Sequence, residues 1–171
     1  MTDLTKKDKN IKISNTPIEN QWTFFSASEE EKKPLVQSDF LEDEHENAFS
    51  EVAKELIRNK VNMGCFEHPD GCAKFTGWCD DTMQFQLLLD GEIIKDIRFT
   101  TDGCGATIVC GSMLTKMAIS KTLSDVMKIT PDDLLEKLVS IPEDHEHCLS
   151  LAVYTLRLTI EDAQKKNKHS E

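Results

Sequence analysis

The sequence predicts an α+β fold in which helices pack on a small antiparallel sheet of about three strands. Two observations support this class. Apolar residues alternate along two segments that are joined by Asp90-Gly91, a pattern typical of a β-hairpin. Apolar residues also recur at helical spacing before and after that hairpin, so the strands are grouped together rather than alternating with helices.

The 171 residues are enough for one domain of ordinary size and an additional polar segment. Residues 1–38 are predicted to be a flexible polar tail with an acidic run at Glu29–Glu31, because they show no sustained hydrophobic period. Residues 39–165 are predicted to form the folded domain, and residues 166–171 a frayed C-terminus. The apolar patch Trp22–Phe25 in the tail is interpreted as an anchor on the domain, with a docking peptide for a partner as the alternative.

The first element expected in the domain is an amphipathic helix between residues 39 and 58, most clearly after Glu46. Acidic residues at its start favour it, because they interact with the positive end of the helix dipole. Residues 62–81 are interrupted by three glycines and a proline, so we expect loops around one short strand near Ala73–Thr76. The apolar residues that define the helix are Phe49, Val52, Ala53, Leu56 and Ile57.

Two strands follow, and they give the clearest local signal in the sequence. The first carries alternating apolar residues from Met83 to Leu89, and the second runs from Ile93 to Phe99. The Asp-Gly pair between them favours a tight turn, so the two strands should pair antiparallel.

The remaining segments are predicted to be helical. Apolar residues recur at helical spacing over residues 106–121. Thr130 followed by Pro131 predicts a helix start, because Thr caps a helix and Pro suits its first position, and this helix should end near Val139. The last helix is expected to begin at residue 146 or 147 and to fray in the polar sequence QKKNKHSE.

The formal net charge of −11 limits the classes of partner. Nucleic acid and anionic membrane surfaces would be repelled, whereas a protein with a basic face or a cation would be attracted. No apolar run approaches the roughly 20 residues that span a bilayer. The first ten residues lack the apolar core of a secretory signal, and the first arginine is Arg58, unlike a mitochondrial presequence. A cytoplasmic location is therefore expected.

Six cysteines in a cytosolic chain indicate metal or redox chemistry more readily than disulfides, although free cysteines also pack well in a core. Three of them lie at joints between elements. Cys79 precedes the hairpin, Cys104 lies between two glycines before a helix, and Cys148 lies at the start of the last helix. A helix N-terminus stabilises a thiolate, so lowered pKa values are predicted for Cys104 and Cys148. From the residues alone, a metal or cluster site and a set of scattered structural thiols remain equal alternatives.

Three short motifs around these cysteines follow one another at defined intervals. They are Cys79-Asp80-Asp81, Ile97–Gly105, and Pro142 followed by His147-Cys148. In this order they resemble the U-type iron–sulfur cluster assembly scaffolds, the IscU family that also forms the N-terminal domain of NifU. The resemblance covers about residues 49–165 and implies an IscU/NifU-N-like fold of the SufE/IscU type. It also implies an assembly scaffold rather than an enzyme.

The resemblance implies a set of site residues and a cargo. Cys79, Cys104 and Cys148 would bind the cluster, with Asp81 or His147 in the fourth place. Cys148 or Cys104 would accept sulfur first, because thiolates at helix ends are the better nucleophiles. The cargo would be a transient 2Fe-2S cluster built from iron and sulfur, and isolated protein could also contain zinc, because tetrahedral thiolate sites accept it readily.

The implied partners are a cysteine desulfurase, an electron donor such as a ferredoxin, and apo-proteins that receive the cluster. Two departures from the family bear on this. The chaperone-recognition stretch Leu-Pro-Pro-Val-Lys of the family is Ile-Pro-Glu-Asp-His at residues 141–145 here, which argues against docking of the specialised Hsp70-type chaperone. Asp80 replaces a glycine of the family, and Asp tolerates left-handed backbone better than most residues, so the turn can persist.

Two other functions are weighed against the scaffold. A zinc-bound sulfur acceptor of the SufU type, a sulfurtransferase partner, would carry an insertion between the second and third cysteines. Here 25 positions separate Cys79 from Cys104 and 44 separate Cys104 from Cys148, which leaves no room for that insertion. A structural zinc domain used for docking would normally need four firm Cys or His ligands.

The other cysteines have no counterpart among the implied ligands. Cys65 and Cys72 are predicted to be structural, with auxiliary sulfur or metal handling as the alternative, and Cys110 is predicted to lie in the core. His145 is placed either within reach of the site or on the surface. The histidines predicted to be solvated are His45, His68 and His169.

Overall fold

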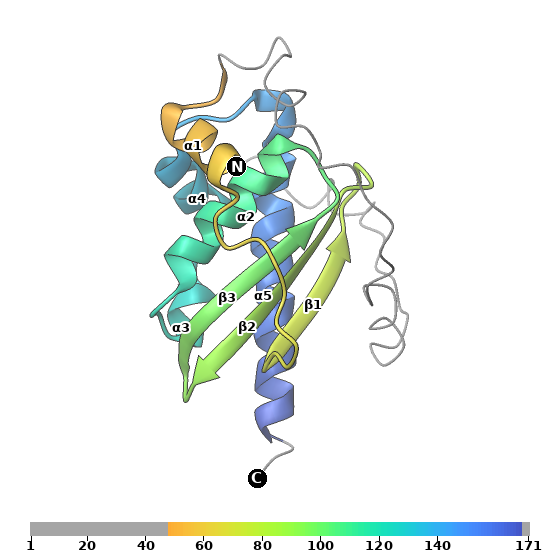
Figure 1. Cartoon of the computed structure of the whole chain (residues 1–171), viewed down its shortest axis with the longest axis vertical. Helices are drawn as coiled ribbons and strands as arrows, with labels where there is room; N and C mark the ends of the chain where they lie inside the picture. The colour runs from red at the N-terminus through yellow and green to blue at the C-terminus, as the bar shows by residue number, and fades with distance from the viewer. Residues whose placement is uncertain (1–47, 169–171) are drawn as a thin grey trace, which may run out of the picture.

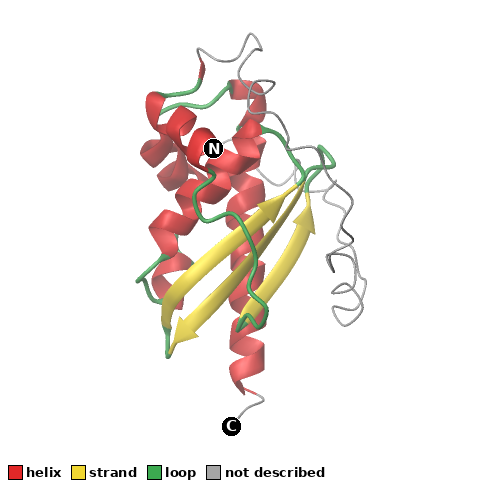
Figure 2. Cartoon of the chain, in the orientation of Figure 1, coloured by secondary structure: helices red, strands yellow, loops and turns green. Residues whose placement is uncertain are grey.

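One layer of the structure is a three-stranded antiparallel sheet in the order β1-β2-β3, and helices form the other layer (Figure 1, Figure 2). The structure is a computed structural model that describes residues 48–168. The strands are β1 (Gly71–Thr76), β2 (Thr82–Asp90) and β3 (Ile93–Thr101). The helices are α1 (Glu51–Asn59), α2 (Gly105–Ala118), α3 (Leu123–Val126), α4 (Pro131–Leu138) and α5 (His147–Lys168), with a 3-10 turn, η6, at Glu143–His145. The predicted α+β class is confirmed.

The hairpin of β2 and β3 forms as predicted. Phe85 pairs with Phe99 and Leu87 with Ile97, and Gly91 takes the left-handed φ of 61° that the tight turn requires. These four apolar side chains are completely buried, because the face of the sheet that carries them is covered by helices. The alternation in the sequence therefore identified the buried face correctly.

Helices α5 and α2 cover that face side by side. A Cβ atom added to Gly71 of β1 would lie 2.7 Å from the Cβ of Ala163 in α5, and one added to Gly111 of α2 would lie 2.4 Å from the Phe99 ring of β3. Both helices therefore approach the sheet at distances that only glycine permits. The core lies between these two helices and the sheet, and α1 and α4 pack against α2 from outside.

The segment that joins α1 to β1 crosses the opposite face of the sheet (Figure 1). The backbone N–H of Phe66 donates to the side-chain oxygen of Gln86 at 2.6 Å, and the Arg98 guanidinium lies 4.6 Å from the centre of the Phe66 ring. The N–H of Gly64 donates to the carbonyl of Phe99 at 2.9 Å. The open edge of β3 is therefore partly covered by this segment.

Several helix boundaries differ from the sequence prediction. Helix α1 begins at Glu51, because the Ser50 side chain accepts the N–H of Ala53 and caps it, so Phe49 precedes the helix. Helix α2 ends at Ala118 rather than residue 121, because the backbone of Ser120 leaves the helix and donates to the carbonyl of Ile94 in β3. The short helix α3 was not predicted.

For α4 the structure confirms the predicted start, whereas α5 extends beyond its predicted end. Helix α4 begins after Thr130, whose side chain and the carboxylate of Asp133 form a capping box, as the sequence indicated. Helix α5 continues to Lys168 instead of fraying after Ala163, and an ion pair of 2.8 Å between Asp162 and Lys166 spans one turn of this end.

The remaining expectations concern membrane-spanning segments and the predicted tail. The described helices include none that is both long and apolar enough to cross a membrane. The predicted tail at residues 1–38, with its apolar patch, and the histidines at positions 45 and 169 lie outside the described residues.

Candidate metal and sulfur site

Cys79 and Asp81 are presented by the tight loop between β1 and β2. The N–H of Gly77 donates to the carbonyl of Asp81 at 2.9 Å, and the N–H of Asp80 donates to the carbonyl of Gly77 at 3.2 Å. Asp80 has a φ of 64°, which is the left-handed backbone expected where an Asp replaces a glycine. The turn is therefore kept, and Cys79 and Asp81 lie on the same side of the molecule.

Cys104 is presented by the connection between β3 and α2. It occupies the N-cap position of α2 with an extended backbone, and its carbonyl accepts the Thr107 hydroxyl at 2.6 Å. The Thr101 hydroxyl, which donates to the carbonyl of Thr82, accepts the N–H of Gly103 at 3.1 Å. These bonds tie the Cys104 loop to the start of β2, next to the loop that carries Asp81.

His147 and Cys148 are the first two residues of α5, directly after the turn η6. Cys148 is completely buried, whereas His147 is half-buried. Helix α5 packs along β1 and β2, so its N-terminus meets the β1–β2 loop at one end of the sheet.

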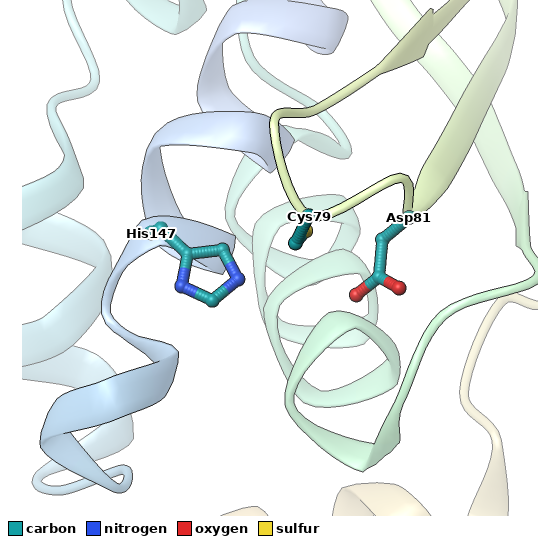
Figure 3. A group of neighbouring side chains, drawn as sticks. All are labelled: Cys79, Asp81 and His147. Atoms are coloured by element: carbon teal, nitrogen blue, oxygen red, sulfur yellow. The ribbon is translucent and has the colours of Figure 1, made fainter. Parts of the chain in front are cut away.

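The five residues predicted for the site meet in two groups that share Asp81. The ligand atoms of Cys79, Asp81 and His147 all lie within 4.8 Å of one another, and so do those of Asp81, Cys104 and Cys148. Figure 3 shows the first group, with the His147 ring on α5 directed towards Cys79 and Asp81 on the loop. The sequence offered Asp81 and His147 as alternatives, and the structure brings both into the same group.

Gly103 leaves the space that the Asp81 carboxylate occupies. A Cβ at position 103 would lie 2.7 Å from Cγ and Oδ2 of Asp81 and 2.7 Å from Oγ1 of Thr107. At Gly105, on the other side of Cys104, a Cβ would only touch Ile57 at an ordinary 3.5 Å. Of the two glycines that flank Cys104, the first therefore makes room for the shared carboxylate.

The pKa values of the Cys104 and Cys148 thiols are shifted in opposite directions. Cys104 accepts a hydrogen bond from the Cys148 thiol and the N–H groups of Thr107 and Ala106, which together lower its pKa to about 6 against the effect of burial. Donating that bond in buried surroundings raises the pKa of Cys148 well above its usual range. The predicted lowering is confirmed for Cys104 and wrong for Cys148. Burial is also the main cause that raises the pKa of Cys79.

The other cysteines lie apart from these two groups. Cys110 is completely buried in α2, as predicted, and burial raises the pKa of its thiol. Cys72 is buried in β1, where its sulfur accepts the side-chain N–H of Gln84 at 3.2 Å. Cys65 is exposed in the segment before β1. Of the histidines outside the groups, His68 is exposed as predicted, and His145 stacks on His147 with 6.1 Å between ring centres.

Sequence reasoning missed Trp78, which directly precedes Cys79. Its side chain is 64% exposed, and its ring centre lies 4.9 Å from that of His147. A bulky aromatic residue in a loop of small and polar residues was the signal that pointed to it.

The donor types fit iron, zinc or a small iron–sulfur cluster. Thiolates are soft ligands that suit these metals, whereas a carboxylate is a harder and more readily exchanged ligand. The arrangement offers three sulfur donors, one nitrogen donor and one carboxylate within a small volume. It can therefore hold a metal centre without closing every coordination position with sulfur.

Comparison with known proteins shows what residues 48–170 of the chain are similar to. Residues 48–170 match the family model described as "NifU-like N terminal domain". The chain is 36% identical to the "Iron-sulfur cluster assembly scaffold protein IscU 1" of Archaeoglobus fulgidus over 120 residues, which are 70% of this chain and 78% of that protein. It is 32% identical to the scaffold protein IscU of Escherichia coli over 127 residues, which are 71% of this chain and 98% of that protein.

A solved structure supports the fold. The N-terminal NifU-like protein from Brucella abortus superposes with a TM-score of 0.56, covering 71% of this chain and 97% of that chain at 16% identity. At such low identity the likeness concerns the fold alone.

Proposed function

Because the chain belongs to the NifU-like N-terminal domain family, we propose that it is a scaffold on which an iron–sulfur cluster is assembled, rather than an enzyme. The observation that carries this proposal is the meeting of Cys79, Cys104 and Cys148 with Asp81 and His147 at one end of the sheet. These residues come from three separate connections of the fold. The cluster is the cargo of the site rather than a resident cofactor.

The mixed ligands suit a cargo that must leave. Three thiolates would hold the cluster, and Asp81 or His147 would fill the remaining place. A carboxylate exchanges more easily than a thiolate, so the cluster can be passed to an apo-protein without breaking a complete set of sulfur ligands. Asp81 suits this role because it lies within 4.8 Å of donors in both groups.

Sulfur is proposed to enter at Cys104. The Cys104 thiolate attacks the outer sulfur of a persulfide on a cysteine desulfurase, which forms an S–S bond on Cys104 and releases the desulfurase thiolate. Reduction of each sulfane sulfur to sulfide takes two electrons, so the two sulfurs of one cluster need four. The lowered pKa of Cys104 favours this residue over Cys148, which is buried and keeps its proton. When two such sulfurs combine with two ferrous ions, the iron supplies two of the four electrons as it becomes ferric, and an electron donor such as a ferredoxin supplies the other two, which gives a 2Fe-2S cluster.

The proposal is tested by anaerobic reconstitution of the full chain with ferrous iron, cysteine and a cysteine desulfurase. We expect visible absorption of a 2Fe-2S cluster with about two iron and two sulfide per cluster. The triple variant in which Cys79, Cys104 and Cys148 are all changed to Ser should form none. A wild type without a cluster, or a triple variant that retains one, would refute the scaffold. Zinc in purified protein is compatible with it, because the same donors bind zinc.

A second experiment addresses release of the cluster. If the Asp81 carboxylate promotes exchange, the variant Asp81→Ala should hold its reconstituted cluster longer than the wild type. The measurement is the decay of visible absorption after an apo-ferredoxin is added as acceptor. Faster loss in Asp81→Ala would contradict the role given to this carboxylate.

A further inference from the structure

Trp78 is an exposed aromatic residue in contact with a residue of the site. Its side chain is 64% exposed, although burying an indole is generally favourable. Its ring centre lies 4.9 Å from that of His147, and the two ring planes meet at 59°. This distance and angle fall within the range of attractive aromatic pairs. Trp78 therefore makes an aromatic contact with a possible donor of the site.

His147 also has a second aromatic neighbour. The ring of His145 stacks on it with 6.1 Å between ring centres and 24° between planes, and Nδ1 of His145 lies 2.9 Å from a carboxylate oxygen of Asp144. Two aromatic contacts thus act on the His147 ring, one from the β1–β2 loop and one from η6. Contacts from two elements therefore restrict the half-buried His147 ring.

The orientation of this ring decides whether it can act as a donor. An imidazole nitrogen donates along one direction in the ring plane, and the torsion that turns the ring is intrinsically broad. One ring nitrogen of His147 lies within 4.8 Å of the Cys79 sulfur and an Asp81 oxygen (Figure 3). Rotation of the ring away from this orientation would remove the nitrogen from the first group.

We propose that Trp78 is a positioning residue whose indole holds the His147 ring with a nitrogen facing Cys79 and Asp81. Its effect on metal binding passes through His147, and Trp78 itself contributes no ligand. The inference rests on the proposed function, because it gives His147 a role in holding the cargo. It assigns a use to the one aromatic residue that the β1–β2 loop contains.

The test uses Co²⁺ as a probe, titrated anaerobically into the reduced, metal-free full chain. Thiolate-to-cobalt absorption reports sulfur ligands, and the d–d bands report the geometry and the kind of the other ligands. We expect Trp78→Ala to bind Co²⁺ about three- to tenfold more weakly, which corresponds to the loss of one aromatic pair. Its d–d bands should shift towards those of His147→Ala, whereas Trp78→Phe should retain most of the affinity and the wild-type bands.

Two further variants separate positioning from a general effect on structure. In a His147→Ala background, Trp78→Ala should cause no additional weakening, because its effect passes through the missing ring. Tyr154→Leu is the matched control, since Tyr154 is an aromatic residue of α5 that is 38% exposed and packs on Phe75 with 4.8 Å between ring centres. It should bind Co²⁺ like the wild type.

The outcomes are distinguishable. Wild-type affinity and bands in Trp78→Ala would overturn the positioning role while leaving the scaffold intact. Equal weakening by Trp78→Ala with and without His147 would also overturn it, because the indole would then act independently of that ring. A wild type without any thiolate-to-cobalt absorption would remove the proposed function together with this inference.

Discussion

At the scale of single residues, Cys104 and Cys148 show how two thiols at helix starts acquire different chemistry. Cys104 is the N-cap residue of α2 and Cys148 lies in the first turn of α5, where free N–H groups and the helix dipole favour a thiolate. The Cys148 thiol keeps its proton and donates a hydrogen bond to the sulfur of Cys104, which is the more exposed of the two. The pair therefore provides one nucleophile and one proton donor.

The first prediction concerns the pH dependence of Cys104 alkylation in reduced, metal-free protein. A thiolate reacts and a thiol does not, so a pKa of about 6 means that the rate rises through pH 6 and is nearly constant above pH 7. An ordinary thiol would still gain reactivity near pH 8.5. The measurement is iodoacetamide modification at Cys104, followed by mass spectrometry.

The control for this profile is Cys148→Ala, which removes the strongest hydrogen bond to the Cys104 sulfur. Its midpoint should move to higher pH, because the thiolate loses stabilisation. A wild-type midpoint at pH 8 or above would show that the proposed division of roles between the two thiols is wrong.

The second prediction uses the two glycines that flank Cys104. Gly103→Ala should displace the Asp81 carboxylate, because the new Cβ would lie 2.7 Å from it, and should therefore slow cluster release, as is expected for Asp81→Ala. Gly105→Ala, whose Cβ meets Ile57 at 3.5 Å, is the matched control and should release the cluster at the wild-type rate. Both rates are followed by visible absorption with the same acceptor. Identical behaviour of the two variants would contradict the role assigned to Gly103.

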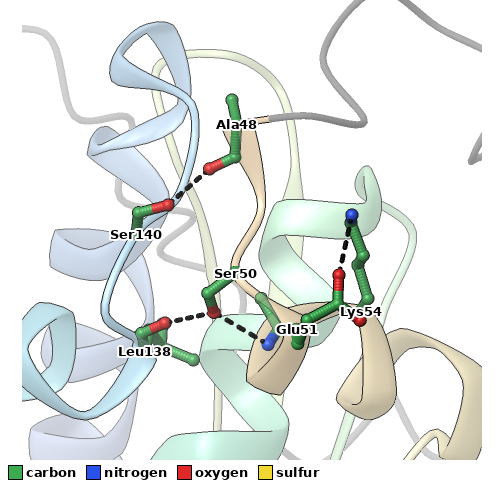
Figure 4. Close-up of polar contacts among 7 residues, drawn as sticks. Ala48, Ser50, Glu51, Lys54, Leu138 and Ser140 are labelled. Carbon is green, nitrogen blue, oxygen red and sulfur yellow. Dashed lines mark hydrogen bonds and ion pairs between the residues drawn. The ribbon is translucent and has the colours of Figure 1, made fainter.

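At the scale of elements, α1 is joined to the connection after α4 by two serines. The Ser50 side chain accepts the N–H of Ala53 at 3.1 Å, and its hydroxyl donates to the carbonyl of Leu138 (Figure 4). The Ser140 hydroxyl donates to the carbonyl of Ala48 at 2.6 Å. One side chain thus caps α1 and ties it to α4, which the local sequence pattern did not indicate.

The third prediction is that Ser50→Ala lowers the free energy of unfolding by about 1–2 kcal/mol, because both the cap and the contact with Leu138 are lost. The control is Glu51→Gln, which removes an exposed pair with Lys54 at 3.0 Å and should change stability by less than about 0.5 kcal/mol. Urea unfolding followed by circular dichroism measures both. A Ser50→Ala variant as stable as the control would argue against the connection.

At the scale of the whole molecule, all buried apolar residues of the described core lie between Ala53 and Ala163. They come from the sheet, from helices α1 to α5 and, for Ile141, from the connection after α4, and the family model matches residues 48–170. The separation of a tail at residues 1–38 from a folded domain stays a prediction, because residues 1–47 lie outside the described part of the chain.

The fourth prediction tests this division. Deletion of residues 1–38 should leave a domain that still unfolds in one cooperative thermal transition, because no residue of the described core is removed. Deletion of residues 1–20 alone is the control, since it retains the patch Trp22–Phe25. The interpretation of the patch as an anchor predicts a thermal unfolding midpoint that is lowered by the longer deletion but not by the shorter one. Loss of the cooperative transition in the longer deletion would contradict the division into tail and domain.

The sequence by itself determined the local features of this protein. Alternation and Asp90-Gly91 predicted the hairpin, and Thr130 and Pro131 predicted the start of α4, because turn and cap preferences depend on a few neighbouring residues. The order of the motifs and the resemblance that it carries also named the five residues that the structure brings together in two groups. The start of α1 and the end of α2 were predicted less well, because a capping contact decided the first and pairing with β3 the second.

Only the tertiary structure decided how the site residues relate to one another. Asp81 belongs to both groups, Gly103 makes room for it, and Trp78 packs on His147, although these residues come from different connections. The opposite pKa shifts of Cys104 and Cys148 likewise arise from a contact between residues of different connections. A sequence pattern reports burial and backbone preference along the chain, whereas the proton affinity and orientation of a side chain depend on the atoms that packing brings next to it.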